Sequence, residues 1–519
     1  MRTAKISNSR SQQTVSAKTV SSPVGGWNTR DPISEMPETD ALILENFICR
    51  TTKVETRKGL LDYLTGLATT VESLLVYRSP LLQKMFACSS AGIFDASVGG
   101  AFAAALVALT NGQLEYVNFS TAGGSYLLAV NGTDPMKSYN GTIWSDAAIT
   151  GAGITGFTTS IFNNISQFKH RIFLTAKGSS SFFYLPIDAV AGAVTEFPMG
   201  QLFSKGGFLQ SCLNWTIDGG SGADDYCLFL TSEGECAVYK GTDPASAATW
   251  ALQGIFVLPK PIGKKCMMKY GGDVLILTES GVYPISKALQ SSSIDRRIAI
   301  TDKIVGAFSI AANAYFTIHG WEAFLYSKED LLIFNIPTSL GASAEQYVMN
   351  TLTGSWSKLT GIPATCFAVF NNLMYYGMAG KVGQALVGVS DNGAIIASTA
   401  QQAYNYFGSR GALKHVDLVR PILEAAGAYA LGLAVVVDYK IAINPVAVAE
   451  TGNISAAKFD TSVFDTATWG FDTTTETSWR TVASEEGTAL SFLMTVASNR
   501  TTVAWDVTDF AFSRGALLG

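Results

Sequence analysis

The stretch LFLTSEGECAVYKG (228–241) contains the unit on which the fold prediction rests. A run of mostly apolar residues ends in a Ser/Gly turn, and a second run follows that carries an aromatic residue and ends in a polar turn. Short runs of this kind, bounded by turn residues, are typical of β-strands. The same order recurs in three other stretches: MFACSSAGIFDAS (85–97), LLAVNGTDPMKSYNGTIW (127–144) and LILTESGVYPIS (275–286).

The pattern around these units indicates an all-β chain. From about residue 70 to about residue 405, apolar, β-branched and aromatic residues alternate with polar ones and are interrupted by Gly, Asn and Asp. Long amphipathic helices are almost absent from the pattern. Asn-Gly pairs tolerate the positive φ angles of a type I′ turn, so we expect them to close hairpins; they stand at 131–132, 140–141 and 392–393.

The spacing of the units favours a β-propeller. They recur at irregular intervals of about 35–50 residues, which is the range of propeller blades. One four-stranded blade cannot bury both of its faces alone, whereas radial stacking buries them and leaves only short edges. Six to eight blades would need about 250–350 residues, which 70–405 provides. On the repeat evidence alone, a pair of β-sandwiches is the alternative.

We predict four parts along the chain. Residues 1–22 form a flexible basic arm, and residues 23–69 form an N-terminal strap with a short helix that starts at Asp40. Residues 70–410 form the β-propeller, and residues 411–519 form a C-terminal antiparallel β domain or complete the ring.

The predicted arm is rich in Ser, Thr and Gln, and its basic residues have no acidic residue among them. Such an arm is either without a role or becomes ordered on an acidic neighbouring subunit or on nucleic acid. The candidate docking residues are Arg2, Lys5, Arg10 and Lys18.

The composition excludes several classes of protein. The net charge of −5 argues against a nucleic-acid coat with a basic stripe. Only 15% of the 519 residues are charged, against about 25% in an average soluble domain, so we expect other chains to cover part of the surface. The seven cysteines form no CxxC pair and predict buried free thiols rather than disulfides or a zinc site. No secretory signal or membrane-spanning run is visible, so we expect a soluble protein.

The sequence offers no catalytic constellation. It contains no GxSxG or HExxH motif. Gly263-Lys264-Lys265 ends like a phosphate loop, but Leu258 stands where the leading glycine belongs. We therefore predict no catalytic, cofactor-binding or metal-binding residue, and no cofactor. The local cluster Lys260, Lys264, Lys265 and Lys269 is interpreted either as solvated loop charge or as a contact with an acidic partner.

The most specific stretch is SSPVGGWNTRDPISEMPETDALILENFICRTTKVETRKG (21–59). It resembles the N-terminal signature of the tail hub or nozzle proteins of short-tailed phages, also called packaged-DNA stabilisation protein or tail tubular protein B. More loosely, SGVYPIS (280–286), NTLTGSWSKLTGI (350–362) and HVDLVRPILEA (415–425) resemble later parts of that family. The strap residues that carry the resemblance are Gly25, Gly26, Trp27, Asn28, Arg30, Asp31, Asp40, Asn46, Arg57 and Gly59.

The resemblance implies a structural virion protein that is not an enzyme. It would form a homo-oligomeric ring, a hexamer, below the head-to-tail adaptor, and would conduct and retain packaged DNA until ejection. Its implied partners are the adaptor proteins, tail fibres or spikes, a tail needle or plug, and DNA that passes without sequence-specific binding. It would be assembled in the bacterial host cytoplasm and reside in the virion tail.

Two other functions remain open at this stage. One is a propeller-borne glycan hydrolase or lyase that acts on the host envelope. The other is a soluble propeller that only binds partners.

Overall fold

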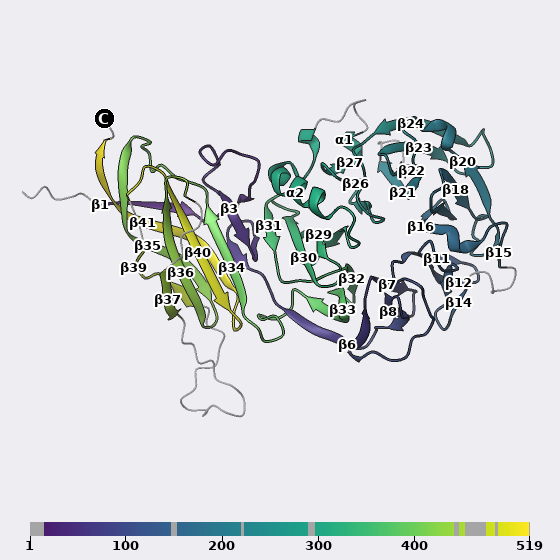
Figure 1. Cartoon of the computed structure of the whole chain (residues 1–519), viewed down its shortest axis with the longest axis horizontal. Coiled ribbons are helices and arrows are strands. Elements are labelled where there is room, and N and C mark those ends of the chain that lie inside the picture. Colours follow the sequence, from purple (N-terminus) through teal and green to yellow (C-terminus); the bar gives the residue numbers. More distant parts are fainter. Residues whose placement is uncertain are drawn as a thin grey trace, which may run out of the picture. The chain divides into compact units, whose positions relative to one another are not determined.

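The computed structural model describes residues 15–146, 153–218, 223–288, 296–440, 446–451, 474–482 and 486–517. The chain divides into two compact units, each traced in Figure 1. We call the unit made of residues 59–351 and 358–388 the propeller unit. The unit made of residues 1–58, 352–357 and 389–519 is called the sandwich unit.

Seven sheets of three or four strands follow one another in the described part of the propeller unit. The first three are β7 (Ser73–Arg78), β8 (Gln83–Ser89) and β9 (Gly92–Asp95); β11 (Glu115–Thr121), β12 (Gly124–Val130), β13 (Lys137–Tyr139) and β14 (Trp144–Asp146); and β16 (Phe162–Phe168), β17 (Arg171–Ala176), β18 (Ser181–Tyr184) and β20 (Thr195–Pro198). The next two are β21 (Leu209–Asp218), β22 (Ala223–Thr231), β23 (Glu235–Gly241) and β24 (Trp250–Val257); and β25 (Met267–Tyr270), β26 (Asp273–Thr278) and β27 (Gly281–Pro284). The sixth is β28 (Glu322–Tyr326), β29 (Leu331–Ser339), β30 (Ser343–Asn350) and β31 (Trp356–Leu359), and the seventh is β32 (Cys366–Phe370), β33 (Leu373–Ala385), β6 (Leu60–Thr70) and β10 (Gly100–Ala101). Of β31, Lys358 and Leu359 belong to this unit, whereas Trp356 and Ser357 belong to the sandwich unit.

These sheets close into a ring, as Figure 1 shows for this unit. The first strand of each sheet contacts the first strand of the next, in the order β7, β11, β16, β21, β25, β28, β32, and β32 contacts β7 again. The seventh sheet joins both ends of the unit, because β6 pairs antiparallel with β33. The fold is therefore a β-propeller, as the sequence predicts, with seven blades in the described residues.

The repeated sequence units occupy equivalent positions in the blades. Each of the four lies in the second and third strands of its sheet: β8–β9, β12–β13, β22–β23 and β26–β27. The Asn-Gly pairs at 131–132 and 140–141 lie in the loops that join the antiparallel strands β12–β13 and β13–β14, which confirms that they close hairpins. The expected type I′ φ angles, positive at both residues, occur only at Asn392-Gly393 (50° and 88°) among these three pairs. Asn131 and Asn140 instead accept hydrogen bonds from backbone N–H groups two and three residues ahead, which makes Asx turns.

The blades pack through apolar side chains between neighbouring sheets. Between the third and fourth sheets, the rings of Phe182 and Phe229 stack with centroids 4.4 Å apart, and Phe182 also stacks on Phe173 and Phe197. Phe182 is fully buried. All seven cysteines are buried free thiols, which confirms that prediction. Two helices, α1 (Ile285–Ala288) and α2 (Val305–Tyr315), follow the third strand of the fifth sheet, at the point where most other sheets have a fourth strand.

The sandwich unit consists of two sheets. One has the order β38 (Thr474–Glu476), β35 (Ala412–Ala425), β41 (Val503–Leu517), β5 (Val54–Thr56) and β4 (Phe47–Cys49), with β1 (Val15–Ser21) on β41 and β39 (Arg480–Thr481) on β35. The other has the order β2 (Gly26–Trp27), β3 (Asp40–Glu45), β34 (Ile396–Gln402), β40 (Leu490–Ser498), β36 (Tyr429–Val437) and β37 (Val446–Thr451). The ring of Phe492 in β40 lies 5.7 Å from that of Trp505 in β41, so the sheets face one another across an apolar core.

The structure corrects three of the predicted parts. Residues 15–21 are not a flexible arm, because β1 pairs along its whole length with β41. The predicted short helix at Asp40 is strand β3, since its backbone pairs with β2 and β34. The propeller starts at residue 59 and not at 70, because β6 belongs to its seventh sheet, and it ends at 388 and not at 410.

We expect Phe182→Ala to destabilise the propeller unit by about 3–5 kcal/mol, because it removes a fully buried ring from between two blades and leaves a cavity. Urea unfolding followed by tryptophan fluorescence measures this. The matched control is Leu81→Ala, whose side chain is exposed and should change the unfolding free energy by less than about 0.5 kcal/mol. Equal midpoints for Phe182→Ala and the parent chain would contradict the packing described.

Candidate functional site

The Gly-Gly turn of the strap requires glycine at its second position. Gly26 has a φ of +92°, and a Cβ on it would lie 2.6 Å from both the backbone N and the backbone O of Trp356. Gly26 pairs with Asp40 on one side and with Trp356 on the other, all within the sandwich unit. Close approach of three backbones explains why no side chain fits here. Trp27, the next residue, is buried.

Asn28 is the centre of a polar network that holds the strap after this turn. Its side-chain amide donates to Asp31 Oδ2 and to Asp40 Oδ2, at 2.8 Å in each case. Its carbonyl oxygen accepts from the backbone N–H groups of Arg30 and Asp31. Arg30 in turn forms an ion pair with Asp31 at 2.8 Å. Asn28 is buried, so the network satisfies polar groups that would otherwise be costly to bury.

Arg57 ties the other end of the strap into the same unit. Its guanidinium forms a bidentate ion pair with Asp391, with N–O distances of 2.8 and 2.6 Å. Its Nε donates to Asn46 Oδ1 at 3.0 Å, and Asn46 donates to the backbone O of Ala397. The Arg57 side chain is only 1% exposed. Asp391 has no signal in the sequence, because it lies more than 300 residues away and carries no local motif.

Gly59 lies in the propeller unit, where its N–H donates to Gly388 O. The other nine strap residues belong to the sandwich unit. The contacts of Gly26, Asn28 and Arg57 hold the N-terminal segment in the sheets of that unit.

The proposed docking residues fall into two groups. Arg2, Lys5 and Arg10 lie outside the described residues. Lys18 lies in β1, where its ammonium is 3.7 Å from Glu38 and 5.6 Å from the centre of the Phe407 ring. The interpretation of Lys18 as an unopposed charge on a flexible arm is wrong, because Glu38 and β41 become its neighbours in the fold.

A second group of polar residues meets at the axis of the propeller, where several of the first strands begin. Lys265 Nζ lies 2.7 Å from Glu322 Oε2, and the other oxygen of Glu322 accepts from the backbone N–H of Phe367. Burial opposes the charge of Lys265, but the attraction of Glu322 and Glu115 outweighs it and raises its pKa. Burial also raises the pKa of Glu115, against the attraction of Lys265 and Lys264.

His319 lies beside this ion pair and lines the same small cavity. Its Nε2 is 3.1 Å from the backbone O of Glu72, and burial lowers its pKa to about 4. The cavity measures about 20 Å³, which is room for about one water molecule. Lys264, which also lines it, donates to the backbone O of Asn131, and burial lowers its pKa.

The predicted lysine cluster is thus divided by the fold. Lys260 pairs with Glu233 at 2.9 Å near the surface, whereas Lys264 and Lys265 face the axis. Lys269 lies in a different cavity. Neither of the two interpretations offered for the cluster describes Lys264 and Lys265. Glu115 and Glu322 each begin the first strand of a blade. A correct assignment of the first strand of each blade would therefore have identified them as residues near the axis.

Within the described ranges, no group of three or more His, Cys, Asp or Glu residues could hold a metal ion. No helix in the same ranges is long and apolar enough to cross a membrane.

No family model matches this sequence, and no curated protein matches it. Among solved structures, the similar ones include BBS1N in complex with ARL6DN (9% identity, TM-score 0.38, 63% of this chain and 96% of that chain covered). The WD40 domain of Neurospora crassa Pan2 shows 8% identity with a TM-score of 0.38 and the same coverage. Saccharomyces cerevisiae Sqt1 shows 11% identity and a TM-score of 0.37, with 67% of this chain and 96% of that chain covered. The fold assignment rests on the strand order and ring closure, and we infer no function from these neighbours.

We expect Arg57→Met to destabilise the sandwich unit by about 3–5 kcal/mol, because it leaves Asp391 without its partner at a largely buried site. Arg57→Lys should recover only part of this loss, since an ammonium cannot make the bidentate pair. Chemical denaturation of the three proteins measures the differences. The exposed pair Arg410–Glu35 provides the control, and Arg410→Met should cost clearly less than Arg57→Met, because solvent screens an exposed pair. Equal losses at the two sites would contradict the structural role of Arg57.

Burial of His319 should make the protein less stable at low pH. Its folded pKa of about 4 lies below the ordinary value of 6.5, so the unfolded chain binds the proton more readily. The stability that comes from keeping His319 neutral is therefore complete above pH 6.5, and it is lost as the pH falls towards 4. We expect His319→Gln to unfold with a shallower loss of stability than the parent between these pH values. A parental slope in His319→Gln would contradict the exclusion of the proton from this site.

Proposed function

We propose that this chain is a structural subunit of a phage tail that forms a nozzle or hub ring below the head-to-tail adaptor. The ring conducts packaged DNA and retains it until ejection. The observation that carries the proposal is the strap signature of residues 21–59, which resembles that of the nozzle family. Its polar residues make the contacts with Asp31, Asp40 and Asp391 described above, so the quoted motif corresponds to a defined substructure.

The propeller axis bears on where a DNA channel would lie. The axis is occupied by the Lys265–Glu322 ion pair and by His319, around a cavity of about 20 Å³. A DNA duplex, whose major groove alone is about 12 Å wide, has no room there. A conduit therefore has to be enclosed by several copies arranged around a common axis. Head-to-tail contacts between identical chains close into rings of this kind when the rotation between copies permits it.

The charge balance supports passage rather than tight binding of DNA. With a net charge of −5, the chain as a whole repels phosphates more than it attracts them. Affinity for DNA depends on neutralising phosphates with Lys and Arg, which a conduit has to avoid along most of its length. The low charged fraction of 15% also fits a subunit whose surface is partly covered in an assembly.

The residues at the propeller axis argue against the alternative function of a glycan hydrolase or lyase. Such an enzyme places two carboxyl groups about 5–9.5 Å apart around a sugar ring. Here Glu322 is paired with Lys265 and with the backbone N–H of Phe367, and the cavity beside it holds about one water molecule. We therefore keep the structural role as the single proposal.

The proposal is tested on virions of the phage that encodes the chain. We expect the polypeptide in purified particles by mass spectrometry, and gold-labelled antibodies against it at the tail. Purified chain mixed with the head-to-tail adaptor should form a ring that cryo-electron microscopy resolves. Particles that lack the polypeptide would overturn the proposal.

The basic arm is tested separately in the same assembly reaction. Replacing Arg2, Lys5 and Arg10 by Ala leaves strand β1 intact, since β1 starts at Val15. We expect this variant to lose co-assembly with the adaptor. A matched variant, Lys287→Ala, changes an exposed lysine of the propeller unit and should assemble normally. Normal assembly of the triple variant would remove the docking role from the arm and leave the ring proposal untouched.

A further inference from the structure

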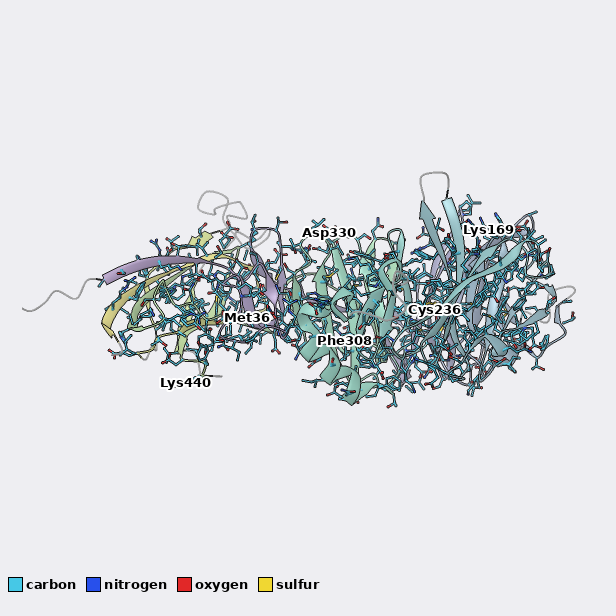
Figure 2. All side chains as sticks on the ribbon, turned by 90° about the horizontal axis from the view of Figure 1, so that it is seen from above. Met36, Lys169, Cys236, Phe308, Asp330 and Lys440 are labelled. Carbon is cyan, nitrogen blue, oxygen red and sulfur yellow. The ribbon has the colours of Figure 1, made fainter. Side chains whose placement is uncertain are left out.

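A larger cavity lies beside the first strands of four neighbouring blades, and it is separate from the small one at the Lys265–Glu322 pair. Its volume is about 390 Å³, and it is bounded by residues of β11, β16, β21 and β25 together with Lys169 in the turn after β16. A second cavity of about 190 Å³ shares Asn214 and Lys269 with it. Figure 2 shows Lys169 at one rim of the propeller unit, beside the long β21–β22 hairpin. A volume of this size is that of a ligand site.

Three polar side chains of this cavity, those of Ser166, Gln167 and Asn214, make no hydrogen bond within the described part of the protein. Ser166 is only 6% exposed, and its hydroxyl lines the cavity without a hydrogen bond. The side-chain amides of Gln167 and Asn214 also line it and make no hydrogen bond within the described ranges. Gln167 and Asn214 are only partly buried, so water can reach the polar groups of this cavity. A ligand that fills the cavity would replace this water with hydrogen bonds of its own.

The charge of the cavity is positive. Lys269 lines both cavities and forms no ion pair among the described residues. Burial lowers the pKa of Lys269, against the attraction of Asp225. Asp225 is already bound by Lys169 and by the hydroxyl of Thr216. Two lysines thus face one carboxylate, and the ammonium of Lys269 is left to attract an anion.

The turn that carries Lys169 is strained. Lys169 and His170 have φ angles of 45° and 57°, in the left-handed region that favours glycine or asparagine. The sequence Phe168-Lys169-His170-Arg171 therefore forms a tight two-residue hairpin from residues poorly suited to it. Strain of this kind is found where a side chain has to be held in a particular place. Here it holds Lys169 at the rim of the cavity.

We propose that this cavity binds a carboxylate side chain presented by an extended peptide segment of a partner protein. The ammonium of Lys269 pairs with the carboxylate. The amides of Gln167 and Asn214 and the hydroxyl of Ser166 bond to the peptide groups beside it. Val117, Ile165 and Leu213 supply the apolar wall against which the segment packs. Amide groups match a peptide backbone better than they match a compact anion, which has no N–H to donate.

The test uses the full chain with methyl-labelled Ile, Leu and Val, observed by NMR. The probe is the capped peptide acetyl-Gly-Glu-Gly-Gly-amide, titrated to about 20 mM, with the Gln peptide of the same length as its match. We expect saturable shifts of the Val117, Ile165 and Leu213 methyl signals with the Glu peptide, and at least tenfold weaker binding of the Gln peptide. Lys269→Met should abolish the shifts, whereas Lys287→Met, at an exposed lysine outside the cavity, should not.

Three kinds of result would overturn the proposal. The first is no shift of these methyl signals up to 20 mM of the Glu peptide. The second is equal binding of the Glu and Gln peptides, or unchanged binding in Lys269→Met. The third is tighter binding of glucuronate or inorganic phosphate than of the Glu peptide at the same methyl groups, which would assign the cavity to a saccharide or to a free anion. Ser166→Ala keeps the fold and should weaken peptide binding, which separates loss of the site from loss of structure.

Discussion

The pairing of β6 with β33 is the constraint on which the propeller depends. β6 is the first strand of the unit and β33 is the last long one, so one antiparallel ladder joins the two ends of more than 300 residues. Without it, the seventh sheet would keep only β32 and β33, and β33 would present an unpaired edge. The inner strands β32 and β7 make the contact that completes the ring. The attraction between Glu115, in the second blade, and Lys265, before the fifth, depends on this closure, because only a closed ring brings non-neighbouring blades together at the axis.

The sequence predicts the strands well because their signal is local. The strand–turn–strand units at 85–97, 228–241 and 275–286 lie in the second and third strands of their blades, since a period of two and a small turn residue need no distant partner. The predicted helix at Asp40 failed for the opposite reason. DALILE has no clear period, and its backbone is decided by pairing with β34, which lies about 350 residues away. The arm failed similarly, because β1 exists only through β41.

The candidate sites were less predictable than the fold. Lys264 and Lys265 looked like loop charge because nothing near them in the sequence is acidic, while Glu322 and Glu115 come from other blades. Arg57 was found through a family resemblance, but its partner Asp391 had no signal at all. In the larger cavity, Ser166 and Asn214 are ordinary strand residues, and what distinguishes them is that they line a common space and make no side-chain hydrogen bond within the described ranges. Each of these features joins residues that are far apart in the sequence, in the ring or in the sandwich unit, so local patterns do not contain it.

The way the chain uses its few charges bears on the proposed assembly. Charged residues are only 15% of the sequence, and several of those present are turned inward. Arg57 is buried against Asp391, Lys265 against Glu322, and Lys414 is fully buried with its ammonium bound to the backbone oxygens of Ser409, Ala412 and Thr488. These groups fix the strap, the axis and the sandwich, but they do nothing to solvate the surface. Fewer charged side chains therefore lie on the surface than the composition suggests. A surface with few charged side chains is expected of a subunit that buries part of it against neighbouring chains.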